Sequence, residues 1–225
     1  MAPGDSTWYG RLDRRTILDA ALRIAARPGA TGIRVRDLGD ELDADPTAIY
    51  RHFRGKSQLM AALIDRLMSD LGSTMPLEAD LGDFMRAMAT GALETFVRYP
   101  PIGAHLVDSR PVGPAEFALI ELSLRKFEEA GLGRDTLVAH YAAFSGLLLS
   151  YVAATCRELV TAGAVSSVGM SDLPWLPTEV EITAESYPTL SSYGEQLLGM
   201  DFRAIYFAGV DVLIDSIVRM AAAAK

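Results

Sequence analysis

The 225-residue chain has few residues of the kinds that mark secreted, membrane or metal-binding proteins. It has one cysteine, Cys156, which excludes an internal disulfide, and its place in an apolar run indicates a buried structural thiol. No uninterrupted apolar run reaches the roughly 18 residues that a membrane span requires. The N-terminal sequence MAPGDSTWYGRLDRR lacks the basic start and apolar core of a signal peptide. We therefore expect a cytoplasmic protein with no membrane partner.

Signatures of catalysis and of cofactor binding are equally scarce. The three histidines and the cysteine do not have metal-ligand spacing, so no metal site is predicted. GDSTWYG and AGAVSSVG lack the lysine and the strand–helix context of a phosphate loop. No Ser/His/Asp set has a supporting local motif. We expect no cofactor and no enzymatic activity.

The composition is that of a protein with a sizeable core, and its charge is unevenly placed. Half of the residues are hydrophobic, 22% are charged, and the net charge is −8. Residues 1–60 hold ten Lys/Arg against eight Asp/Glu, whereas residues 61–225 hold eleven against twenty-one. A mildly basic end on an acidic chain permits nucleic-acid binding there.

Helical periodicity dominates the chain, and strand signals are scarce. We predict an all-α fold. The expected helix at 57–71 can be capped by Ser57, and the longest apolar helix, at 136–161, by Asp135. The expected helices span residues 11–27, 35–42, 46–53, 57–71, 84–99 (stopped by Pro100–Pro101), 102–108, 115–130 (ended by Gly131), 136–161, 190–198 and 202–222, with a long loop at 162–186.

Two short expected helices, 35–42 and 46–53, stand between a preceding helix and a long one. This order indicates a helix-turn-helix, which presents its second helix to the DNA major groove. Asp45 can cap the second helix, and Pro46 fits its first turn, where a missing N–H is harmless. Apolar residues give both helices a face for one small core: Val35, Leu38, Leu42, Ile49 and Phe53.

The outward side of the second helix has residue types suited to DNA. Thr47 and Ala48 are short enough for close backbone approach to base edges, and Arg51 and His52 can donate hydrogen bonds. The Tyr50 hydroxyl can reach a phosphate oxygen. Lys56, at the start of the next helix, adds its charge to the positive end of that helix.

The segment IRVRDLGDELDADPTAIYRHFRGKSQLMAAL resembles the TetR family of bacterial one-component repressors. The match is to the pattern Tyr-x-His-Phe, a two-residue turn, Lys and a long connecting helix, and it covers residues 10–65. A weaker likeness to an actinobacterial-type effector domain lies in SYPTLSSYGEQLLGMDFRAIYFAGVDVLIDSI. The resemblance implies an all-helical homodimer with a three-helix headpiece, residues 1–56, and an effector-binding and dimerisation domain, residues 57–225, entered by a connecting helix at about 57–71.

The function that the resemblance implies is a ligand-responsive, sequence-specific repressor on a pseudo-palindromic DNA operator. A small, largely apolar effector would release it. Asp43 stands where the family usually has Gly in the turn, and with Asp45 it puts negative charge near the expected phosphate path, which favours weak non-specific binding. The expected DNA contacts are Arg36, Pro46, Thr47, Ala48, Tyr50, Arg51, His52 and Lys56.

Polarity and the family architecture suggest the remaining sites. The expected effector-binding residues are Phe84, Met88, Tyr99, His105, Arg110, Phe117, Tyr141, Phe144 and Leu148. Small residues that let helices approach closely indicate a four-helix dimer interface of Ala142, Gly146, Ser150, Ala153, Ala204, Ala208 and Gly209. Simple core packing is the alternative interpretation of both sets.

Two other functions compete with this one. A small-molecule-processing enzyme with an appended helix-turn-helix would need a catalytic constellation, and the sequence shows none. A helical protein-interaction module would use YRHF to bind an acidic partner, and a preference for particular DNA sequences would argue against it.

Overall fold

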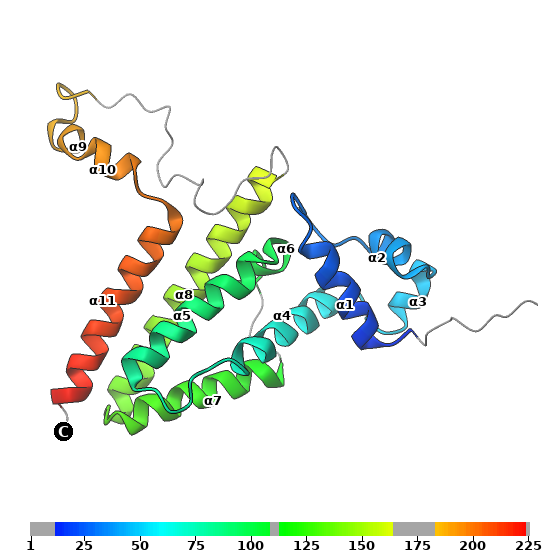
Figure 1. The fold of residues 1–225 in the computed structure, drawn as a ribbon, viewed down its shortest axis with the longest axis horizontal. Coiled ribbons are helices and arrows are strands. Elements are labelled where there is room, and N and C mark those ends of the chain that lie inside the picture. Colours follow the sequence, from blue (N-terminus) through cyan, green and yellow to red (C-terminus); the bar gives the residue numbers. More distant parts are fainter. Residues whose placement is uncertain (1–11, 109–112, 164–182, 224–225) are drawn as a thin grey trace, which may run out of the picture.

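The computed structural model describes residues 12–108, 113–163 and 183–223. Every regular element in these ranges is an α-helix, which confirms the all-α prediction. Two groups of helices are joined by one long helix, α4 (Figure 1). The N-terminal group, which we call the headpiece, contains α1 (Arg14–Ala25), α2 (Val35–Leu42) and α3 (Pro46–Tyr50), and α4 (Lys56–Gly72) leads out of it.

The C-terminal group is a bundle. In Figure 1, α5, α8 and α11 run side by side, with α4 and α7 packed together across one end. The two short helices α9 and α10 project from the bundle, and none of their residues is buried. The elements are α5 (Leu81–Val97), α6 (Pro100–Gly103), α7 (Pro114–Glu129), α8 (Arg134–Gly163), α9 (Pro188–Ser192), α10 (Gly194–Leu198) and α11 (Phe202–Ala223).

Local chemistry explains where several helices begin and end. Asp13 caps α1 by accepting the Thr16 N–H at 2.8 Å, and Asp80 caps α5 by accepting the Asp83 N–H at 2.9 Å. Gly131, at φ 98°, ends α7 in the left-handed conformation that the sequence predicted. The N–H groups of Gly131 and Leu132 bond back to the carbonyls of Glu128 and Phe127, which satisfies two of the last helical carbonyls.

Several helix boundaries differ from the sequence prediction. Gly55, not Ser57, is the N-cap of α4, and Ser57 lies in the first helical turn. Asp135 lies inside the first turn of α8 instead of capping it. The prolines at 100 and 101 begin α6, which replaces the expected helix over 102–108, because proline is tolerated in a first helical turn. The expected helix 46–53 is helical only to Tyr50.

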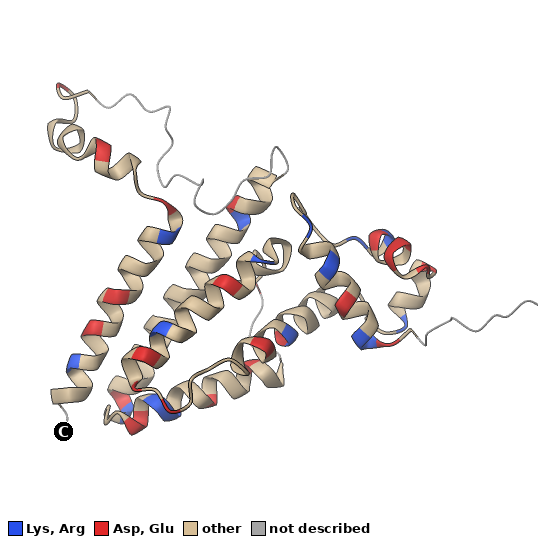
Figure 2. Ribbon diagram, viewed as in Figure 1, with Lys and Arg blue, Asp and Glu red and all other residues tan. Residues whose placement is uncertain are grey.

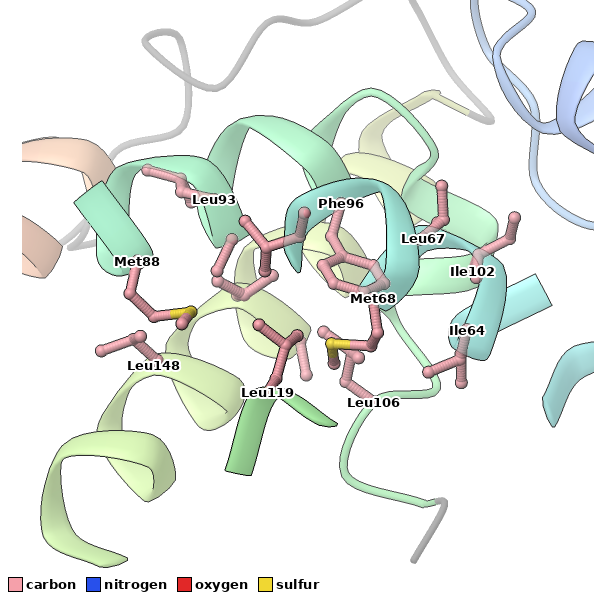
Figure 3. Packing of buried hydrophobic residues seen from close by; sticks show 14 of the residues in the cluster. Ile64, Leu67, Met68, Met88, Leu93, Phe96, Ile102, Leu106, Leu119 and Leu148 are labelled. Carbon is pink, nitrogen blue, oxygen red and sulfur yellow. The ribbon is translucent and has the colours of Figure 1, made fainter. Parts of the chain in front are cut away.

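The hydrophobic core is continuous from the headpiece into the bundle. Figure 3 shows side chains from α4, α5, α7 and α8 converging inside the bundle, with Met68, Met88, Leu119 and Leu148 among them. On the far side, the buried Tyr206 of α11 donates its hydroxyl hydrogen to the Ala89 carbonyl oxygen at 2.8 Å. This bond and the Arg86–Asp211 ion pair at 2.6 Å hold α11 against α5.

The headpiece meets the bundle at three places besides the α4 backbone. Arg66 of α4 contacts Asp19 of α1 at 3.4 Å, and α1 also packs near α6. In the connection after α1, Gly29 has φ 73° and lies against Gly163 at the end of α8. A Cβ on Gly163 would lie 3.3 Å from the Gly29 Cα, so the two backbones are in close contact.

Candidate DNA-binding surface and apolar cavity

The start of α3 is organised by Asp45. Its Oδ1 accepts the backbone N–H of Thr47 at 2.7 Å and the Thr47 hydroxyl hydrogen at 2.6 Å. These two bonds hold the pKa of the Asp45 carboxyl below its ordinary value. Because the Thr47 proton is committed to Asp45, the exposed hydroxyl can only accept a hydrogen bond from DNA. In the major groove, such donors are the amino groups of adenine and cytosine.

The turn before α3 is tight. Asp43 has φ 47° and ψ 46°, the left-handed conformation that glycine usually takes, and the N–H groups of Asp43 and Ala44 both donate to the Gly39 carbonyl. A Cβ on Gly39 would lie 2.9 Å from the Ala44 oxygen and 3.2 Å from the Pro46 Cγ. Gly39 therefore allows α2 to approach the first residue of α3 closely.

Arg51 and His52 follow α3 in a tighter turn, because their N–H groups bond to carbonyls three residues back, those of Ala48 and Ile49. Arg51 is exposed, and His52 is partly buried. The His52 carbonyl accepts a hydrogen bond from Arg14 of α1 at 2.6 Å. The Arg14 guanidinium also stacks 4.2 Å from the centroid of the Phe53 ring. Arg14 thus holds the turn at the end of α3 in place. Local sequence patterns could not indicate this role, because Arg14 and His52 are 38 residues apart.

A hollow of about 290 Å³ lies between the start of α2, the end of α3 and the start of α4. Tyr50 and Lys56, which the sequence predicts to contact phosphates, both border this hollow, and Tyr50 is 52% exposed. Arg34, which the sequence analysis did not select, also borders it and pairs with Asp37 at 3.0 Å. The hollow therefore combines two cations and a phenol, the groups that bind phosphate oxygens.

None of the eight expected DNA contacts lies in the protein core. Ala48 and His52 are partly exposed, and the other six are exposed, with Arg36 on α2 and Pro46 at the start of α3. Ion pairs to Glu41 of α2 from Arg23 of α1 and from Arg27, which follows α1, keep the helices behind this surface together. Contact of these residues with DNA stays a prediction.

An apolar cavity of about 250 Å³ lies between α4, α5, α7 and α8. Its few polar groups are Glu116, Ser123, Tyr141 and Ser145. Burial raises the pKa of the Tyr141 phenol, with an opposing contribution from a hydrogen bond to Ser145. The apolar lining is Met68, Leu71, Met88, Ala92, Leu119, Ile120, Phe144, Leu148 and Leu149.

The structure brings four of the nine expected effector residues to this cavity: Met88, Tyr141, Phe144 and Leu148. Four others lie elsewhere. Phe84 is in the core at 1% exposure, Phe117 is 58% exposed on α7, Tyr99 lies beside Arg98, and His105 pairs with Asp108 at 3.2 Å. Arg110 lies outside the described residues, as do residues 164–182 of the expected loop. None of the cavity residues of α4 and α7 was expected from the sequence, because local patterns do not distinguish them from other residues of those helices.

The expected dimer residues divide into two groups. Ala142, Gly146, Ser150, Ala204 and Ala208 are exposed on α8 and α11. Ala153, however, is fully buried within its own chain, so its side chain cannot reach a partner. Gly209 approaches the Leu147 side chain of α8, since a Cβ there would lie 3.3 Å from it. Ala153 and Gly209 thus pack inside one chain, and the dimer interface of the exposed residues stays a prediction.

Two further properties of the described residues bear on function. These residues contain no group of three or more His, Cys, Asp and Glu side chains placed to hold a metal ion. Among them α8 is the one helix long and apolar enough to cross a membrane, which is weak evidence because core helices of bundles pass the same test. Here α8 packs against α5, α6, α7 and α11.

Comparison with known proteins gives two matching family models. Residues 17–63 match the model for bacterial regulatory proteins of the tetR family, and residues 75–220 match the tetracyclin repressor-like C-terminal domain. The HTH-type transcriptional repressor DrrR1 of Streptomyces coeruleorubidus is 28% identical over 217 residues, covering 92% of this chain and 76% of its own. The class D tetracycline repressor of Escherichia coli is 27% identical over 132 residues, or 57% of this chain and 60% of its own.

Solved structures agree on the fold. A transcriptional regulator from Streptomyces coelicolor A3(2) superposes with a TM-score of 0.74 at 24% identity, covering 94% of this chain and 98% of its own. ActR from Streptomyces coelicolor, in complex with actinorhodin, gives a TM-score of 0.70 at 18% identity, covering 94% and 99%. The family model matched by residues 17–63 is one of bacterial regulatory proteins, and the two sequence relatives described above are repressors.

Proposed function

The chain belongs to the TetR family of bacterial transcriptional regulators, and on that premise we propose that it is a ligand-responsive, sequence-specific repressor. It acts in the cytoplasm as a homodimer on a pseudo-palindromic operator, and a small, largely apolar effector releases it. The observation that supports this most directly is that the single helix α4 runs from the headpiece to the apolar cavity. Its first turn places Lys56 beside the exposed side of α3, while Met68 and Leu71, further along, line the apolar cavity.

DNA recognition is divided between bases and phosphates. Thr47 and Arg51 face solvent at and just after α3, where a helix seated in the major groove meets base edges. Tyr50, Lys56 and Arg34 border the hollow beside it and bind the phosphate backbone, which positions the headpiece. In a dimer, two headpieces about 34–36 Å apart engage successive major grooves.

The exposed small residues of α8 and α11 support the dimer. Between residues 136 and 156, α8 carries no Asp, Glu, Lys or Arg, and Figure 2 shows this uncharged middle section. Val138 and Val212 are 57% and 68% exposed on these two helices. A second copy of the chain would cover this surface and would let the two helices pair with their symmetry mates.

The cavity supports an effector that is mostly apolar with a few polar groups. At about 250 Å³ it is slightly below the roughly 300–1,000 Å³ of typical ligand pockets, so a modest opening would admit a small molecule. The names of relatives point to small organic ligands, since one is named a nicotine-responsive repressor and others are named tetracycline repressors. The ligand acts by binding the DNA-incompetent arrangement more tightly than the competent one.

Selection of duplexes from a random-sequence pool tests the proposal. We expect a preferred pseudo-palindrome. Arg51→Ala should weaken binding to the selected duplex, by about 10-fold or more, while affecting random DNA less. Lys56→Ala should weaken binding to both and lower the salt slope by about one unit.

The measurement is a gel-shift titration of both duplexes over a range of salt concentrations. Arg125→Ala, an exposed arginine on α7 far from the headpiece, is the matched control and should change neither affinity. Unchanged affinity and salt slope in both headpiece variants would remove the assignment of this surface to DNA binding.

A further inference from the structure

The N-terminus of α7 lacks a capping side chain of its own, since its N-cap residue is Gly113. The acceptor comes from another helix. Asp65 of α4, fifty residues earlier, accepts the Ala115 N–H on its Oδ1 at 2.9 Å, in a partly buried position. The first N–H groups of a helix have no intrahelical partner, so Asp65 performs the role of an N-cap across two helices.

Gly113 makes room for this bond. A Cβ at position 113 would overlap the Asp65 carboxylate and would lie 2.7 Å from the Asp65 Cβ. The backbone of Gly113 has φ −120° and ψ 154°, a conformation open to any residue. Space for Asp65, and not backbone freedom, is therefore what requires glycine here.

Asp65 lies where the two functional regions meet on α4. The next residue, Arg66, contacts Asp19 of the headpiece at 3.4 Å. Met68, almost one turn further, lines the cavity, as does Glu116, the residue after Ala115. Consecutive residues of α4 thus bond to different parts of the molecule, Asp65 to a cavity helix and Arg66 to the headpiece.

We propose that Asp65 is the positioning residue that couples the cavity to the headpiece. By holding the first turn of α7 on α4, it makes the cavity wall and the connecting helix move together, so that displacement of α7 by an effector reaches α1 and α3. Coupling is reciprocal, so DNA binding at the headpiece must alter the first turn of α7 by the same route. This inference rests on the proposed function.

The effect of DNA binding on the first turn of α7 can be tested without an effector. Hydrogen exchange is measured for the backbone amides of residues 113–120 in the full-length protein, with and without a duplex selected from a random-sequence pool. In the wild type we expect the duplex to slow this exchange by about threefold or more, the scale of one hydrogen bond. Asp65→Ala should abolish this response and, by the same linkage, should weaken the duplex Kd by only about threefold.

Three further variants separate coupling from general stability. Asp65→Asn keeps an oxygen acceptor and should retain the response. Gly113→Ala keeps the carboxylate but displaces it, and should lose the response as Asp65→Ala does. Asp70→Ala removes an exposed Arg66 partner at 3.1 Å on the same helix without touching α7, and should behave as the wild type.

The outcomes distinguish the inference from its premise. A response of wild-type size in both Asp65→Ala and Gly113→Ala would overturn the role of Asp65 while leaving DNA binding intact. Absence of any response in the wild type, despite binding of the selected duplex, would also overturn it. Failure to select any duplex would remove the proposed function, and the inference with it.

Discussion

Among single residues, the two carboxylates beside the recognition helix have different structural roles. Asp43 takes the left-handed turn conformation at φ 47°, whereas Asp45 caps α3 and binds the Thr47 hydroxyl. The sequence predicted the Asp45 cap, because Asp followed by Pro is a common helix start. It did not predict that the cap would take the Thr47 proton, since that depends on the side-chain rotamer.

The Asp45 cap makes the stability of the headpiece depend on pH in the acidic range. The pKa of Asp45 is lowered in the folded protein from an ordinary value of 3.8, so the unfolded chain binds this proton more readily. The stabilisation is therefore complete above pH 3.8 and is lost as the pH falls through the lower folded pKa. Asp13 and Glu41 shift in the same direction, through Thr16 and Arg23.

Thermal unfolding followed by circular dichroism between pH 6 and pH 2.5 measures this effect. Asp45→Asn is the matched variant, because Asn can cap the helix but does not titrate. The wild-type advantage in Tm should be constant above about pH 5 and shrink below about pH 4. A difference in Tm that does not vary with pH would contradict the assigned role of the carboxylate.

At the scale of elements, the helix-turn-helix depends on the close approach of α2 to α3 at Gly39. We expect Gly39→Ala to lower the free energy of unfolding by about 1–3 kcal/mol, because the new methyl group meets the Ala44 oxygen and the Pro46 ring. Gly32→Ala, where a Cβ meets nothing within 4 Å, is the control. Urea unfolding measures both variants, and equal stabilities would contradict the packing argument.

The existence of each long helix was predictable, and its ends were less so. Periodic apolar residues predicted α5, α7, α8 and α11 because one side of each helix must be buried. The ends of helices depend on which of several nearby groups reaches the free N–H groups. Ser57 and Asp135 have the right chemistry for a cap, yet both lie within first turns. Asp65 caps α7 from another helix, which no local pattern could indicate.

At the scale of the whole molecule, we expect a homodimer that forms through the exposed side of α8 and α11. Val212, 68% exposed and one turn from Ala208, lies on this surface. Val212→Glu should convert the dimer to a monomer at micromolar concentration, because a desolvated charge would replace an apolar contact. Operator affinity should then fall by about 10-fold or more, since the two half-sites no longer bind as one unit.

Light scattering after size-exclusion chromatography gives the mass, and gel shifts give the affinity. Leu77→Glu is the control, since Leu77 is 57% exposed in the connection between α4 and α5. It should stay dimeric and bind normally. A dimeric Val212→Glu variant with unchanged affinity would place the interface elsewhere.

The sequence by itself determined the all-helical class, the helix-turn-helix, the family and the residue types exposed around α3. These follow from periodicity and from a motif in which cap, turn and recognition residues lie within a few positions of one another. Only the tertiary structure decided which apolar residues line the cavity, because Phe84 and Phe144 look alike in the sequence while one is core and the other borders the cavity. It also decided the burial of Ala153 and the contacts of Arg14 and Asp65, whose partners lie far along the chain and are brought near only when the helices pack.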